Sequence, residues 1–289
     1  MKIYLLLSII CITSLAYASR DVKVQSVVAN TMDAFGQSKF IHLYSKYVQT
    51  AIDRCMMSYG DLPASQIYQD LGLQAQQALG IAPECQVPIK KIKTPSLLHA
   101  VAGSDGIYVN EELLKNKSLG ALRCAMFHEA VHVKYHDAAA LGLFKVTGLL
   151  LGYVATYKTL GMCGVTTFHK GWSVVAGALA SVGFSFKYRQ FMERRADTQG
   201  HQAVNCASCV QEEIEQRTNM YETATQTIFQ NMPEEQRRKI QSSGQNLTES
   251  IENIECMQGY LRRCELEQIK QSLGDKKCSN HLEHHGKVH

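Results

Sequence analysis

The residues of this chain best suited to chemistry are two histidines four positions apart, with a glutamate directly after the first. They are His128, Glu129 and His132, in the stretch FHEAVHVKYHD. On an α-helix, side chains four positions apart share one face, so both imidazoles can bind the same metal ion. The glutamate is offset by about 100° on a helix of 3.6 residues per turn, and it can reach a water molecule at the metal without being a ligand. The spacing predicts a zinc site that activates water.

A carboxylate pair further along the chain supplies a candidate third ligand. Glu193 and Asp197, in the stretch ERRAD, are also four residues apart on one helical face. Glu193 would complete a site of two histidines and one glutamate, with water in the fourth position. Asp197 would hydrogen-bond the other ring nitrogen of a ligand histidine and so fix its tautomer. Taken alone, two acids beside Arg194 and Arg195 would instead indicate a solvated, salt-bridged helix face.

Two further potential ligands flank the histidine motif. Cys124 lies one turn before His128, and His136 lies one turn after His132. A fourth protein ligand would fill the position that water needs. His136 also lies about 6 Å further along the helix axis at 1.5 Å per residue. We therefore predict that Cys124 belongs to the core and that His136 lies on the surface.

The elements that must position these residues are mostly helical. Residues 19–82 carry apolar side chains every three or four positions and predict an N-terminal helical layer. After Pro83 the stretch CQVPIKKIKT is short and β-branched and predicts a strand. Two further short strands around the turn at residues 103–106 predict a small β-hairpin. Its second strand is Ile107, Tyr108 and Val109. The motif helix is expected to begin after Ser118, a suitable N-cap, and to run past Asp137.

Two apolar stretches separate the histidine motif from Glu193. One runs from residue 138 to about 165, and the other spans 171–186; lysines interrupt or bound both. Neither has the roughly 20 uninterrupted apolar residues expected of a membrane-spanning helix. A membrane-dipping hairpin over residues 138–187 and a buried hairpin both fit, and the composition favours the membrane. Glu193 must reach the same metal as the histidines, and a hairpin satisfies this because it crosses the membrane zero or two times.

The N-terminus has the pattern of a secretory signal. A lysine precedes an apolar run that ends in Ala16-Tyr17-Ala18, so residues 1–18 are predicted to be a cleaved signal peptide. An uncleaved anchor helix is the alternative. In both cases the rest of the chain is expected to be exported, to a periplasmic or secretory compartment.

Composition bounds the remaining possibilities. The net charge is +4, without a basic run, which argues against nucleic acid as a partner. Ten cysteines are present, and export would permit disulfides. Cys206 and Cys209 form a lone CxxC, which is more typical of a structural disulfide or of plain helix positions than of a redox pair. Residues 241–289 predict a helical C-terminal tail that contains cysteines and histidines.

Together the two motifs resemble the zinc metallopeptidases that include the CAAX prenyl proteases and the HtpX-type membrane proteases, which are gluzincins with HExxH and ExxAD motifs. The matching residues are His128, Glu129, His132 and Asp137, followed by Glu193, Ala196 and Asp197. The strand segment HAVAGSDGIYVNEELL also matches, with His99 where the family usually has asparagine. The resemblance covers roughly residues 86–200. It implies a zincin-like catalytic core of α+β class, mainly helical, with a small β-hairpin or sheet and an apolar helical hairpin.

The chain departs from the family pattern at two places. The arginine that usually lies three residues before the glutamate ligand is replaced by Gln190, and Arg189 lies one position earlier. The downstream Thr-His-Pro element is absent. The residue that would stabilise the tetrahedral oxyanion therefore stays unassigned.

The resemblance implies a zinc metalloendopeptidase that binds one zinc ion per chain and acts on a protein or peptide substrate, outside the cytoplasm or at a membrane. Residues 83–240 would form the peptidase core. His128, His132 and Glu193 would bind the metal, Glu129 would be the general base, and the strand Ile107–Val109 would hold an extended substrate. The rival hypotheses are a catalytically silent scaffold protein with a structural zinc, and a zinc-free helical interaction module.

Overall fold

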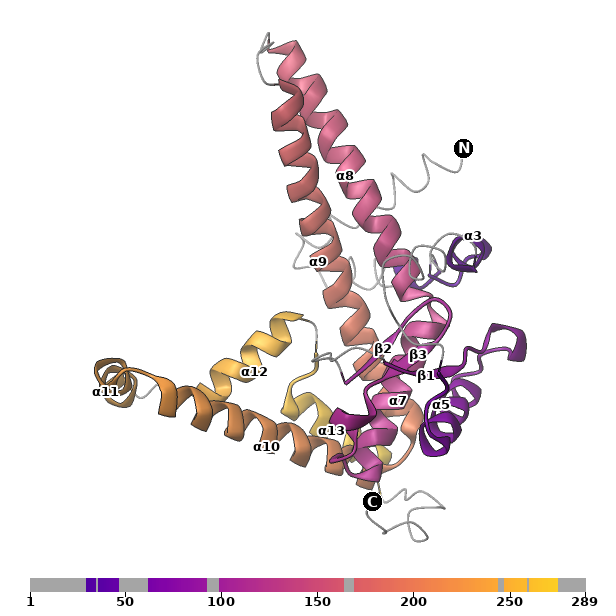
Figure 1. Cartoon of the computed structure of the whole chain (residues 1–289), viewed down its shortest axis with the longest axis vertical. Helices are drawn as coiled ribbons and strands as arrows, with labels where there is room; N and C mark the ends of the chain where they lie inside the picture. Colours follow the sequence, from indigo (N-terminus) through magenta and orange to yellow (C-terminus); the bar gives the residue numbers. More distant parts are fainter. Residues whose placement is uncertain are drawn as a thin grey trace. The chain divides into compact units, whose positions relative to one another are not determined.

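A computed structural model describes residues 30–34, 36–46, 62–92, 99–163, 169–243, 247–258 and 260–274. The predicted signal peptide and the last part of the predicted tail lie outside these residues. The described chain is mainly helical and contains one three-stranded sheet (Figure 1), which confirms the mainly helical α+β prediction. The chain divides into two compact units. One comprises Met1–Met57, Gly103–Asp105 and His132–Phe191, and the other comprises Ser58–Ala102, Gly106–Val131 and Met192–His289.

The sheet belongs to the second of these units. Its strands are β1 (Ile89–Lys91), β2 (Ala100–Ala102) and β3 (Ile107–Val109), in the order β1-β3-β2. β2 and β3 pair antiparallel across residues 103–106, which confirms the predicted hairpin, and β1 pairs parallel with β3. The three residues of β3 are buried, so this central strand is held on both sides.

The same unit also contains helices, one of which packs against the sheet. α5 (Gln66–Ala78) contacts β1, and a Cβ on Gly72 would come within 2.4 Å of the Ile89 side chain, so this approach requires glycine. Further along the chain, α10 (Ala207–Asn231) packs against both α12 (Leu247–Gln258) and α13 (Arg263–Leu273). The remaining bounds are η2 (Pro83–Cys85), α6 (Glu111–Leu114) and α11 (Glu234–Ser243).

The histidine motif lies on α7 (Leu119–Lys134). Ser118 caps the helix as predicted, because its hydroxyl oxygen accepts a hydrogen bond from the Ala121 N–H at 3.2 Å. The helix is buried on several sides, with Leu122, Met126 and Val131 in the core.

The prediction that the motif helix runs past Asp137 is wrong. α7 ends at Lys134, and α8 (Asp137–Met162) begins three residues later. Between them His136 adopts a left-handed conformation with φ 50°, which an α-helix cannot contain. Neither glycine nor proline marks this break, so the sequence carried no signal for it.

The first unit contains α3 (Lys39–Tyr44), α8 and the first part of α9 (His169–Val204). α8 and α9 run side by side (Figure 1). Glycines allow their backbones to touch: a Cβ on Gly177 would lie 2.6 Å from the Leu149 carbonyl oxygen, and one on Gly152 would lie 2.8 Å from the Gly177 Cα. α8 is long and apolar enough to cross a membrane, by length and composition.

Candidate metal centre

The three predicted ligands come together in the structure. His128 and His132 project from consecutive turns of α7, and Glu193 projects from α9. One ligand atom from each, two ring nitrogens and a carboxylate oxygen, lie within 4.8 Å of one another. This group could hold a metal ion. All three side chains are largely buried, so a bound cation would be shielded from bulk water.

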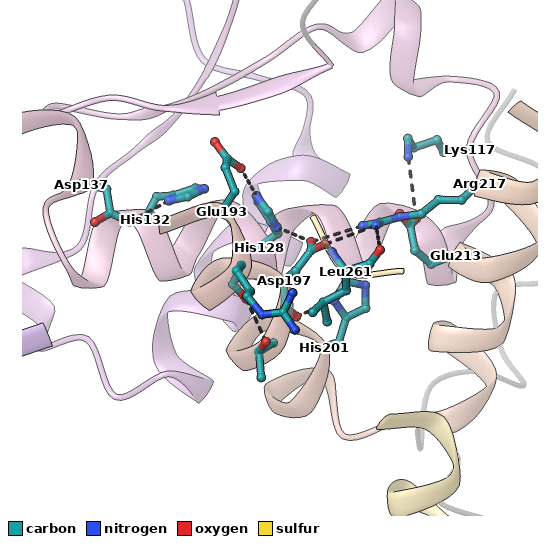
Figure 2. Close-up of polar contacts among 12 residues, drawn as sticks. Lys117, His128, His132, Asp137, Glu193, Asp197, His201, Glu213, Arg217 and Leu261 are labelled. Carbon is teal, nitrogen blue, oxygen red and sulfur yellow. Dashed lines mark hydrogen bonds and ion pairs between the residues drawn. The ribbon is translucent and has the colours of Figure 1, made fainter. Parts of the chain in front are cut away.

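His128 is fixed by carboxylates at both ring nitrogens (Figure 2). Its Nδ1 lies 2.8 Å from Asp197 Oδ1, as predicted for a carboxylate that orients a ligand histidine. Its Nε2 lies 3.3 Å from Glu193 Oε2. Burial lowers the pKa of His128, but the hydrogen bonds to Asp197 and Glu193 outweigh burial and raise this pKa well above its ordinary value. Negative charge around the ring therefore favours a cation at Nε2.

His132 has its own carboxylate partner because of the break between α7 and α8. Its Nδ1 lies 2.8 Å from Asp137 Oδ2. On an unbroken helix a residue five positions later would lie about 140° around the axis, whereas the left-handed His136 turns the chain back toward His132. Tyr188 donates its hydroxyl to Asp137 Oδ1 at 3.0 Å, so this carboxylate is held from both sides. Both are buried.

Glu129 is anchored by the sheet. Its Oε2 accepts a hydrogen bond from the backbone N–H of Ala102 in β2 at 2.7 Å. The glutamate therefore lies between the motif helix and the edge of the sheet, offset from the histidine face as the helical spacing predicts. Its Oε1 is the oxygen that this contact leaves for other chemistry.

The close approach of α9 to α7 depends on one glycine. A Cβ on Gly200 would lie 3.0 Å from both the Cα and the N of His128. A Cβ this close to backbone atoms would push the two helices apart by a few tenths of an ångström. Gly200 thus permits the backbone distance at which Glu193 and Asp197 reach His128.

The donor set fits a tetrahedral zinc ion. In both histidines a carboxylate is hydrogen-bonded to Nδ1, so each would bind a metal through Nε2, as is usual for ligand histidines. Two ligand atoms at zinc distances of about 2.0–2.1 Å lie about 3.3 Å apart in a tetrahedron. The separation between His128 Nε2 and Glu193 Oε2 matches that value.

The role predicted for Ile107, Tyr108 and Val109 needs correction. β3 lies between β1 and β2 and forms backbone hydrogen bonds with both, so it has no edge for a substrate strand. The outer strand nearest to Glu129 is β2. Strand order depends on pairing between distant segments, which the local pattern does not encode.

The two potential ligands that flank the motif, Cys124 and His136, differ in burial. Cys124 is buried, which confirms its place in the core. His136 is half-buried, its Nε2 lies 3.3 Å from His42 Nδ1, and it is not among the three grouped ligand residues. Cys206 is the N-cap of α10, and its sulfur accepts a hydrogen bond from the Cys209 N–H. That is a helix-end role for the CxxC pair.

Several contributors were missed by sequence reasoning. Tyr188 supports Asp137, while Arg217 of α10 and the backbone of Leu261 both contact Asp197. Nothing in their local sequence distinguishes them from other residues on helices and helix ends. Their contacts join segments up to 64 residues apart.

In comparisons with known proteins, no family model, no curated protein and no solved structure matches this chain. The metallopeptidase resemblance therefore rests on the motif residues alone.

Proposed function

We propose that this protein is a zinc-dependent metalloendopeptidase with a zincin-like core, of the kind its two motifs resemble. The observation that carries the proposal is the grouping of His128, His132 and Glu193 ligand atoms within 4.8 Å, with each histidine held at Nδ1 by a buried carboxylate. A chance HExxH sequence would not require three separate carboxylates to converge on the two histidines. A structural zinc site usually has four protein ligands, whereas three leave a position for water.

The chemistry divides between the metal and Glu129. Bound zinc would polarise the scissile carbonyl and acidify a water molecule. Glu129 Oε1 would accept the proton of that water and later deliver it to the leaving amine. The Ala102 N–H holds Oε2 at 2.7 Å, so the carboxylate is oriented before the substrate arrives. His128 and His132 keep their ring planes because Asp197 and Asp137 hold Nδ1.

The outer edge of β2 is the surface that we assign to an extended peptide substrate. The Asn110 N–H donates to the His99 carbonyl at 2.8 Å, which makes His99 and Asn110 a hydrogen-bonded pair. In antiparallel sheets such pairs alternate, so the backbone groups of Ala100 and Ala102 point away from β3. Among the described residues, β3 is the only strand paired with β2. A peptide added there would run beside Glu129.

We also propose that the α8–α9 hairpin enters a membrane and that the chain is exported. Large apolar side chains are exposed on both helices, including Val146, Leu150, Trp172, Leu179 and Val182. The 26 residues of α8 would extend about 39 Å at 1.5 Å per residue, more than the roughly 30 Å apolar thickness of a bilayer. Contact through small residues is typical of helices packed in lipid. The hydroxyls of Thr147 and Thr159 donate to carbonyls of their own helix, which lowers the cost of placing them in lipid.

A substitution at Glu129 tests the enzymatic proposal. Purified wild type and Glu129→Gln would be incubated with unstructured protein substrates, and cleavage products would be identified by mass spectrometry. Wild type should cleave and the variant should not, with equal zinc content in both. Equal cleavage by both would refute the role of Glu129. Zinc binding without cleavage of any substrate would favour a silent scaffold, and folded protein without zinc would favour a helical interaction module.

A further inference from the structure

We propose that Arg217 and the backbone N–H of Leu261 are positioning groups for the metal centre, acting through Asp197 on His128. This rests on the proposed metal site and extends it to the C-terminal helices. Both groups lie well outside the motif segments. Arg217 is on α10, and Leu261 lies in the segment Tyr260–Arg262, just before α13.

Asp197 is the hub of this arrangement (Figure 2). Its Oδ1 accepts hydrogen bonds from His128 Nδ1 at 2.8 Å and from an Arg217 guanidinium nitrogen at 3.2 Å. Its Oδ2 accepts from the other terminal nitrogen of Arg217 at 3.2 Å and from the Leu261 N–H at 2.9 Å. The four contacts account for the four acceptor positions of a carboxylate. The carboxylate plane, and with it the direction in which Oδ1 meets His128, is therefore fixed by Arg217 and Leu261.

The charge of Asp197 depends on the same partners. The side chain has no solvent exposure, and an unpaired buried carboxylate would become protonated rather than stay charged. Only the ionised form accepts hydrogen bonds at both oxygens without carrying a proton of its own.

Arg217 is itself held in place from its other side. Its Nε donates to Glu213 Oε1 at 2.8 Å, one turn earlier on α10, and Lys117 Nζ lies 3.8 Å from Glu213 Oε2. Acidic and basic side chains thus alternate in a largely buried row, in the order Asp197, Arg217, Glu213 and Lys117. A planar guanidinium can pair with both oxygens of Asp197 and still reach Glu213 because its donors are in a fixed fork, whereas a lysine ammonium has all its donors on one atom and cannot form the paired contact with Asp197.

The segment that supplies Leu261 is fastened at its C-terminal end. Arg263, the first residue of α13, donates its backbone N–H and its guanidinium to Glu252 of α12 at 2.7–3.2 Å. At the other end, the Tyr260 ring stacks on His128 with 6.0 Å between ring centroids, and the Arg217 guanidinium lies over Tyr260 at 5.9 Å. The segment thus touches both His128 and the carboxylate that orients it.

This geometry changes the extent of the functional core. The sequence predicted that the peptidase core ends at residue 240. Under this proposal the core extends through α13, because the hydrogen bond of Leu261 to Asp197 comes from beyond that boundary.

Metal affinity tests the proposal without any need for substrate. The dissociation constant for Zn²⁺ would be measured by chelator competition on full-length wild type, Arg217→Met and Arg217→Lys. Loss of groups that orient a ligand's partner usually weakens metal binding about 10–100-fold, and we expect that range for Arg217→Met. Arg217→Lys should recover little, because it keeps the charge but not the fork. Arg238→Met is the matched control, because Arg238 is exposed and pairs with Glu234 on its own helix. The zinc affinity of this variant should equal that of wild type.

A double-mutant cycle separates positioning from general stability. If Arg217 acts through Asp197, then Asp197→Asn combined with Arg217→Met should bind zinc about as weakly as Asp197→Asn alone. The visible absorption of bound Co²⁺ should also change in Arg217→Met, since it reports the ligand geometry.

The backbone donor has its own pair of variants. Leu261→Pro removes the N–H, whereas Leu261→Ala truncates the buried side chain but keeps the N–H, so Leu261→Pro should weaken zinc binding more than Leu261→Ala does. If Leu261→Pro fails to fold by circular dichroism, the Arg217 variants carry the test.

The outcomes that overturn the proposal are distinct from a failure of the proposed function. Tight zinc binding by wild type with an unchanged dissociation constant in Arg217→Met would overturn the positioning role alone. The positioning role would also be overturned if the fold-changes in the zinc dissociation constant caused by Asp197→Asn and Arg217→Met multiplied in the double variant. Folded wild type that binds no zinc would overturn the proposed function, and the positioning role with it.

Discussion

Gly200 offers a test of whether the approach of α9 to α7 builds the metal centre. In Gly200→Ala, the new Cβ would lie 3.0 Å from the Cα and N of His128 and 3.2 Å from the Phe127 carbonyl carbon. These are backbone atoms, so relief requires the two helices to separate by a few tenths of an ångström. Forcing extra volume into a packed contact typically costs about 1–3 kcal/mol.

The opposing effect must be removed by a control. Replacing glycine by alanine inside a helix stabilises it by about 1 kcal/mol through backbone entropy alone. Gly183 is also within α9, and a Cβ there would meet no atom within 4 Å. Gly183→Ala should therefore be neutral or stabilising. The difference in unfolding free energy between the two variants isolates the clash, and we expect Gly200→Ala to be the less stable by about 1–3 kcal/mol.

The assay combines denaturant unfolding with zinc affinity. Separation of the helices would move Glu193 and Asp197 away from His128, so Gly200→Ala should lose zinc affinity as well as stability, and Gly183→Ala should lose neither. Two alanine variants of equal stability and equal zinc affinity would refute the reasoning that this contact sets the site.

Further predictions follow from other contacts. Asp137→Asn should weaken zinc binding about 10–100-fold, measured by chelator competition, because His132 loses an ionised partner; unchanged affinity would contradict that role. Glu129→Gln should keep zinc and lose at least about 100-fold in peptide hydrolysis, measured as a cleavage rate. Burial raises the pKa of Glu252, but hydrogen bonds from Arg263 outweigh burial and lower it, so its stabilising contribution should be present above pH 4.5 and be lost as pH falls further. Glu252→Gln should flatten that part of the pH–stability curve in urea unfolding. Leu179→Glu, on the exposed apolar face of the hairpin, should reduce flotation with lipid vesicles; equal flotation would contradict membrane insertion.

The parts of the site that could be predicted from sequence are those set by local helix geometry. His128 and His132 share a face because they are four residues apart on one helix, and Glu193 and Asp197 do so for the same reason. The β-hairpin was predictable from the Gly-Ser-Asp-Gly turn at residues 103–106 between two short strand-like runs. In each case the controlling interaction lies within a few residues.

The parts that could not be predicted depend on distant segments or on unmarked backbone conformations. His136 adopts the left-handed conformation that brings Asp137 to His132. No glycine or proline in the neighbouring sequence indicates this conformation. The central position of β3 follows from its pairing with β1, which is separated from it in sequence. Arg217 lies on a helix rich in polar residues. The sequence therefore does not distinguish an arginine that binds Asp197 from one that is exposed to solvent.

The central claim is that His128, His132 and Glu193 hold one zinc ion. The most direct test is elemental analysis of purified wild type beside Glu193→Ala, with folding of both checked by circular dichroism. We predict one zinc per chain in the wild type and its loss in the variant. Folded wild type without zinc, or a Glu193→Ala variant that keeps a full equivalent, would contradict the account.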